Sequence, residues 1–124
     1  MYKTWKLQYY SDIGFDGVIC VGDSSDLEHS KSIELFIKQI QNQLNVVYCY
    51  YPELGDAETT QKLLDIVSTP YAVWSGDDDF LVPNGFDKCI SFLESNHDYH
   101  AAHGVAIALN WTNENKVIST RKYD

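Results

Sequence analysis

Three consecutive acids, Asp77, Asp78 and Asp79, follow the short apolar run at residues 71–74. Adjacent carboxylates repel one another, so a fold that holds them together usually supplies a cation to neutralise them. If the chain stays extended through this run, Asp77 and Asp79 point to one face and Asp78 points to the other. Carboxylate oxygens in that arrangement suit a divalent metal. The sequence therefore predicts a metal or ligand site here, in preference to a solvated acidic turn.

A second acidic position follows another apolar run, residues 18–21, which leads into Gly22-Asp23-Ser24-Ser25-Asp26. This run is typical of a short buried strand. In open α/β sheets, ligands bind outside the carboxyl ends of the parallel strands. We therefore expect Asp23 and the acids at 77–79 to face one cleft.

The spacing of apolar residues predicts the elements that would position these acids. Residues 1–13 fit both a helix and a strand, and a helix is favoured. Further helices are expected from residue 27 or 30 to residue 44, from a cap at Asp56 to before Pro70, and from Pro83 to Asn96; strands are expected at 18–21, 46–51, 71–74, 101–109 and 116–120. This alternation predicts an α/β fold, a Rossmann-like parallel sheet with helical crossovers, in a single domain spanning residues 1–124.

The charge balance restricts the partners. Lys and Arg total 9 against 18 Asp and Glu, which gives a net charge of -9 and argues against sequence-independent binding to nucleic acid or to an anionic membrane. No apolar run approaches the roughly 20 residues of a membrane span, and the first ten residues lack the apolar core of a signal peptide. We expect a cytoplasmic protein without a membrane span. Three cysteines without paired metal spacing, Cys20, Cys49 and Cys89, are expected to be reduced core residues.

A family resemblance rests on the runs 18–25 and 72–80, the following helix, and the strand around His103-Gly104. Together these segments resemble the nucleotide-sugar half of a GT-A glycosyltransferase, close to the inverting family 2 group. The resemblance covers most of the chain. It implies an incomplete GT-A fold, because the family's opening strand would have to precede Met1 and most of its acceptor region would follow Asp124.

The resemblance also implies roles for individual residues. Asp23 would contact the nucleobase, with Ser24 beside it in the nucleotide-sugar site. Asp79 would be the principal metal ligand, with Asp77 or Asp78 as its partner toward the ribose or the metal. The cofactor would be Mn²⁺ or Mg²⁺, since a hard cation stabilises the charge that develops on the leaving diphosphate. The expected function is transfer of a sugar from a nucleotide-diphosphate sugar to the hydroxyl of an unassigned acceptor.

Two other functions stay open. A truncated domain of this kind could bind a sugar nucleotide or a partner without turnover, in which case the chain alone is not an active enzyme. A Mg²⁺-dependent phosphoryl-transfer site is the lesser alternative, because Phe80, Leu81 and Val82 stand where such a site expects a hydroxyl residue.

The implied absence of the opening strand also predicts self-association. In the family's sheet that strand lies between the strand that ends at Asp23 and the one that ends at Asp77, so its absence would leave backbone groups unpaired. The alternating residues Trp5, Leu7 and Tyr9 could fill the position, from the same chain or from a second copy. A homodimer is therefore favoured over a monomer.

Overall fold

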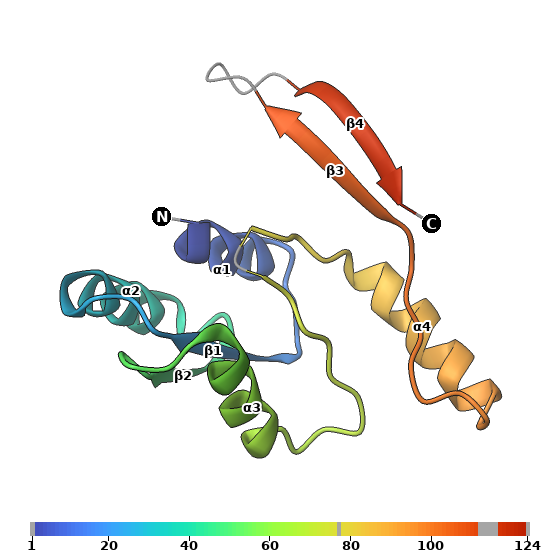
Figure 1. Ribbon diagram of the computed structural model, residues 1–124, viewed down its shortest axis with the longest axis horizontal. Helices are drawn as coiled ribbons and strands as arrows, with labels where there is room; N and C mark the ends of the chain where they lie inside the picture. The colour runs from blue at the N-terminus through green and yellow to red at the C-terminus, as the bar shows by residue number, and fades with distance from the viewer. Residues whose placement is uncertain (1, 77, 112–116, 124) are drawn as a thin grey trace. The chain divides into compact units, whose positions relative to one another are not determined.

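The computed structural model describes residues 2–76, 78–111 and 117–123 (Figure 1). The chain divides into two compact units, Met1–Phe80 and Leu81–Asp124. The elements of the first unit are α1 (Tyr2–Asp12), β1 (Val18–Asp23), α2 (Leu27–Ile40), β2 (Asn45–Tyr50) and α3 (Asp56–Ile66). Those of the second unit are α4 (Pro83–Ser95), β3 (Ala106–Trp111) and β4 (Val117–Tyr123).

The sheet of the first unit has two parallel strands, β1 and β2, joined by the crossover helix α2 (Figure 1). Their register runs from Val18 opposite Asn45 to Asp23 opposite Tyr50. The expected α/β class is thus confirmed as a small domain with a parallel pair of strands and flanking helices. Within the described residues no further strand joins this pair.

Each face of this sheet meets a different helix. Because side chains alternate along a strand, Gly22 and Cys49 share one face while Asp23 and Tyr48 share the other. α3 covers the glycine face so closely that a Cβ on Gly22 would stand 2.3 Å from Cγ2 of Thr59. On the other face the Tyr48 hydroxyl reaches the backbone of α2. Only a residue without a side chain allows α3 to lie this close.

The apolar core of the first unit lies mainly between α1 and α2. Its most buried members are Leu7 and Tyr10 of α1, Ile33, Ile37 and Ile40 of α2, and Leu44 just after α2. The spacing of three and four residues within this set is that of a helix face. The favoured helix at residues 1–13 is therefore confirmed, and the alternative in which Trp5, Leu7 and Tyr9 form a strand is wrong. Leu7 is buried while Trp5 is 59% exposed.

The starts of α2 and α4 agree with the sequence and the N-cap of α3 differs, while α2 ends at Ile40 and α3 at Ile66, earlier than the predicted residue 44 and Pro70. α4 begins at Pro83, as predicted, because the fixed φ of proline suits the first turn and its missing N–H is not needed there. α2 begins at Leu27, after the N-cap Asp26. The predicted cap at Asp56 is wrong by one residue, since Gly55 is the N-cap. The backbone N–H of Gly55 donates a hydrogen bond to Oε2 of Glu58 at 3.2 Å.

The strand predicted at residues 71–74 is absent from the structure. Val73 is 56% exposed and Trp74 is 68% exposed, so the run is not the buried strand that the sequence suggested. The indole Nε1 of Trp74 donates a hydrogen bond to Oγ1 of Thr60 on α3, at 3.3 Å. This contact joins the segment to a helix, and among the described residues the segment pairs with no strand.

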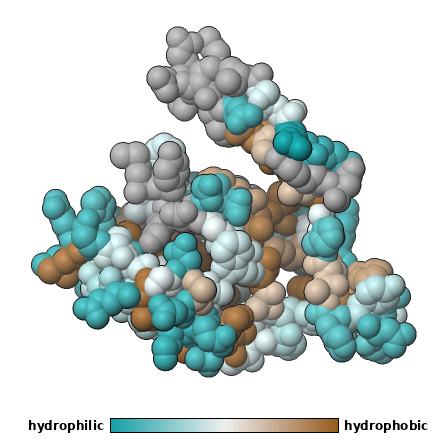
Figure 2. Space-filling model, viewed as in Figure 1, coloured by the Kyte–Doolittle hydropathy of each residue, from teal (hydrophilic) through white to brown (hydrophobic). Residues whose placement is uncertain are grey.

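The second unit contains α4 and an antiparallel pair, β3 and β4, whose register runs from Ala106 opposite Tyr123 and is irregular between Asn110 and Trp111. The two later strands expected from the sequence therefore exist, but they pair with each other and do not extend the parallel sheet. Apolar side chains are exposed among the polar ones in the space-filling view (Figure 2). On β3, Ile107 is 62% exposed and Leu109 is 44% exposed.

Two expectations from the composition can be compared with the structure. Cys20, Cys49 and Cys89 are free thiols, as expected, but they are half-buried and are not among the buried core residues. Among the described residues, no helix combines the length and the apolar character that crossing a membrane requires.

Candidate functional site

Asp23 lies at the carboxyl end of β1 with its side chain completely buried. The hydroxyl of Tyr48, on the neighbouring strand, donates to its Oδ2 at 2.7 Å. The backbone N–H of Ser25 donates to its Oδ1 at 3.1 Å. A buried carboxylate is tolerated when such donors satisfy its oxygens, and here one donor comes from β2 and the other from the loop after β1. Asp23 therefore ties the end of the sheet to residues 24–26.

Tyr48 is the counterpart of Asp23 in this network. Its hydroxyl lies 3.4 Å from the carbonyl oxygen of Ser30, in addition to its bond with Asp23. Burial, followed by the hydrogen bond to Asp23, raises the pKa of Tyr48 well above its usual range. The hydroxyl consequently keeps its proton and acts as a donor to the carboxylate.

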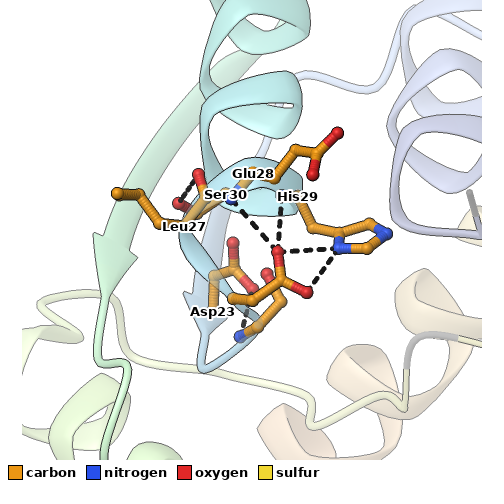
Figure 3. Close-up of polar contacts among 7 residues, drawn as sticks. Asp23, Leu27, Glu28, His29 and Ser30 are labelled. Atoms are coloured by element: carbon orange, nitrogen blue, oxygen red, sulfur yellow. Dashed lines mark hydrogen bonds and ion pairs between the residues drawn. The ribbon is translucent and has the colours of Figure 1, made fainter.

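The first turn of α2 begins directly after this loop (Figure 3). Asp26 caps the helix, because its Oδ1 accepts the N–H groups of Glu28 and His29 at 3.1 and 3.0 Å. The ring Nδ1 of His29 lies 2.8 Å from both carboxylate oxygens of Asp26. The backbone N–H and then the ring of His29 lower the pKa of Asp26 below its usual value. Asp26, and not Asp23, is therefore the N-cap of α2.

The helix starts that follow β1 and β2 are acidic. The first turn of α2 carries Glu28, and the first turn of α3 carries Asp56 and Glu58. Acids at these positions suit the positive ends of helices, but they repel a phosphate. A phosphorylated ligand would need a cation to approach this region.

The second predicted group of site residues lies on the loop after residue 74. Asp77 is outside the described residues, and Asp78 and Asp79 are exposed. A Cβ on Gly76 would stand 3.1 Å from Oδ1 of Asp78 and 3.2 Å from Oδ2 of Asp79. The two carboxylates thus converge on the one residue of the loop that has no side chain. Among the described residues, no set of three or more metal-ligating side chains is gathered in one place.

The loop is held against α1. The ammonium group of Lys6 donates to Oγ of Ser75 and to the carbonyl oxygen of Gly76. The rings of Tyr9 and Phe80 meet edge to face with centroids 5.4 Å apart. Lys6 and Tyr9 are three residues apart on α1 and so lie on the same side of the helix.

The predicted site residues therefore occupy two places on the first unit. Asp23 and Ser24 lie at the end of β1, while Asp78 and Asp79 lie on the loop beside α1. Within the described part of the chain, no hydrogen bond joins Asp23 to Asp78 or Asp79. The expectation that both groups face one cleft stays a prediction.

Two residues that the sequence did not single out contribute most to this geometry. Tyr48 contacts Asp23 from a strand 25 residues away, and Lys6 contacts Gly76 across 70 residues. For Tyr48 a weak signal existed, because residues 48 and 50 share the sheet face of Asp23 once β1 and β2 are aligned. For Lys6 no signal exists in the local sequence.

Comparisons of the chain with protein-family models, with curated proteins and with solved structures found no match.

Proposed function

We propose that this chain binds a nucleotide-diphosphate sugar together with a divalent cation, as the donor-binding part of a GT-A type glycosyltransferase. The observation that carries the proposal is the convergence of the Asp78 and Asp79 carboxylates on Gly76. Carboxylate oxygens are the ligands that Mg²⁺ and Mn²⁺ prefer. In a chain with a net charge of -9, a diphosphate needs such a cation to offset repulsion from the protein.

Different residues would bind the phosphates and the base of the nucleotide sugar. Asp79, with Asp78 and Asp77 of the same loop, would hold the cation and so the phosphates. Asp23 would act on the base through the loop that it fixes, because its own carboxylate is buried beneath Tyr48 and the N–H of Ser25. Ser24, half-buried in that loop, would then stand nearest the ligand.

Calorimetric titration tests the binding step. UDP and GDP are titrated into the protein with Mn²⁺ and, separately, with excess chelator. We expect saturable binding with Mn²⁺ and a loss of about tenfold or more in affinity with chelator, since the phosphates would then face unscreened carboxylates. Equal affinity under both conditions would reject the cation-dependent site.

Matched variants locate the site. Asp79→Asn removes one charge from the loop and should weaken Mn²⁺-dependent binding. Asp87→Asn removes the same charge from the exposed surface of α4 and should leave binding unchanged. If both variants bind equally well, the cation does not bind at the 78–79 loop.

Turnover needs a separate measurement, because binding alone also fits a domain that does not catalyse transfer. The same samples are incubated with UDP-glucose and Mn²⁺, and release of UDP is followed over time. Release that depends on Asp79 supports the transferase, since an enzyme of this class also hydrolyses its donor slowly when no acceptor is present. Binding without release supports the alternative of a sugar-nucleotide-binding domain without catalysis.

A further inference from the structure

Lys6 brings a positive charge from α1 to the backbone of the acidic loop. Its ammonium group is half-buried and donates to the Ser75 hydroxyl and to the Gly76 carbonyl oxygen. A lysine ammonium has three donors, and two of them are used here on neutral oxygens of a segment about 70 residues away. The loop that carries the acidic residues is therefore contacted by a positively charged side chain of the same protein.

The carbonyl oxygen of Gly76 also accepts the backbone hydrogen bond that closes the turn. The backbone N–H of Asp79 donates to it at 3.3 Å, so this oxygen accepts from both the turn and Lys6. A charge-assisted hydrogen bond is about twice as strong as a neutral one. Lys6 consequently stabilises the turn in which the carboxylates of Asp78 and Asp79 converge.

We propose that Lys6 is the positioning residue of the acidic loop, holding Ser75 and Gly76 so that the carboxylates of Asp78 and Asp79 are gathered before any ligand binds. The part of this inference that concerns a metal rests on the proposed function; the part that concerns the loop does not. Tyr9 supports the same arrangement one helical turn along, through its ring contact with Phe80.

The sign of the effect on metal binding separates positioning from simple charge. A nearby ammonium repels a divalent cation, so its removal alone would strengthen Mn²⁺ binding. Removal of a residue that positions the ligands would weaken binding instead. For Lys6→Met we expect about a tenfold rise in the Kd for Mn²⁺, measured by calorimetry.

Lys31→Met is the matched control. It removes the same charge from an exposed position of α2 and should leave the Kd unchanged or slightly lower. Ser75→Ala removes one acceptor of Lys6 without changing the net charge, and it should also raise the Kd. An affinity of Lys6→Met that equals or exceeds that of Lys31→Met overturns the positioning role.

Amide hydrogen exchange tests the loop without metal. In Lys6→Met, exchange of the Asp79 amide should become about tenfold faster. The Leu54 amide, which closes a similar turn onto Tyr51 at 3.2 Å, serves as the internal control and should not change. Unchanged exchange at Asp79 overturns the inference.

The two measurements also distinguish the inference from the proposed function. If the unmodified protein binds no Mn²⁺, the proposed function fails, and the exchange rate of Asp79 alone then decides whether Lys6 holds the loop. If Asp79 exchanges faster in Lys6→Met but the Kd for Mn²⁺ stays the same, Lys6 orders the loop without positioning metal ligands, and the part of the inference that concerns the metal is overturned.

Discussion

Replacing Tyr48 with Phe should destabilise the first unit, because it removes one hydrogen-bond donor from a carboxylate that is completely buried. The hydroxyl of Tyr48 lies 2.7 Å from Oδ2 of Asp23, and the side chain of Asp23 has no exposed surface. A hydrogen bond to a charged group contributes about 1.5–3 kcal/mol to stability. We therefore expect a loss of roughly 2 kcal/mol in the free energy of unfolding.

Urea denaturation followed by circular dichroism measures this loss. With a slope of about 1–3 kcal/mol per molar urea for a small domain, a loss of roughly 2 kcal/mol lowers the midpoint by about 1 M. Tyr50→Phe is the matched control, since it removes the same atom from the same strand and the same sheet face. Within the described residues, the structure gives the Tyr50 hydroxyl no hydrogen bond. A midpoint for Tyr48→Phe no lower than that for Tyr50→Phe would refute the role assigned to this contact.

A double-mutant cycle then assigns the loss to the pair. Asp23→Asn keeps the shape of the side chain but removes the charge and one acceptor oxygen, so its two terminal atoms cannot accept from both the Tyr48 hydroxyl and the Ser25 N–H as those of Asp23 do. If the two residues act through their mutual bond, the effect of Tyr48→Phe should shrink by about 1 kcal/mol or more in the Asp23→Asn background. Additive effects would instead mean that the Tyr48 hydroxyl stabilises the fold through another contact.

Three further predictions concern pH and packing. Because the folded state raises the pKa of Tyr48, its contribution is complete below the unfolded value of about 10 and is lost as pH rises further; alkaline urea titration should show a smaller loss in Tyr48→Phe. The pKa of Asp26 is lowered in the folded state, so its contribution is present above about 3.9 and is lost as pH falls through the folded value; Asp26→Ala should therefore be less stable than the unmodified protein at pH 7, and this difference should narrow at pH 2. Gly22→Ala should lower the free energy of unfolding by about 1–3 kcal/mol, because the new Cβ would stand 2.3 Å from Cγ2 of Thr59. Gly85→Ala on α4, where the new Cβ would have no neighbour within 4 Å, should instead raise the melting temperature.

The elements whose apolar residues face one neighbour along their whole length were predictable from the sequence. Ile33, Ile37 and Ile40 recur at helical spacing, and these residues form the buried face of α2. Pro83 marked the start of α4 because proline suits a first turn. β1 and β2 were recognisable as apolar runs on either side of a helix, which is the arrangement that gives parallel strands.

The features that depend on contacts between distant residues were not predictable. The run at Tyr71–Trp74 has a strand-like composition, but a strand also needs a neighbour with open hydrogen-bonding groups, and Trp74 contacts α3 instead. Asp23 was expected to be at a cleft because it follows a strand. It is buried instead, and its partner Tyr48 is recognised only when the two strands are aligned.

The parallel pairing of β1 with β2 affects the order in which the two units can fold. Val18 lies opposite Asn45, so no rung of this pair can form until the chain has closed a loop of 27 residues that includes α2. The β3–β4 pair is antiparallel, and its rungs join residues as close as Trp111 and Val117. Local contacts form faster than distant ones, because less chain entropy is lost before the first contact is made. The pair in the second unit can therefore form early from its own sequence, whereas β1 and β2 pair only after the segment that contains α2 has brought them together.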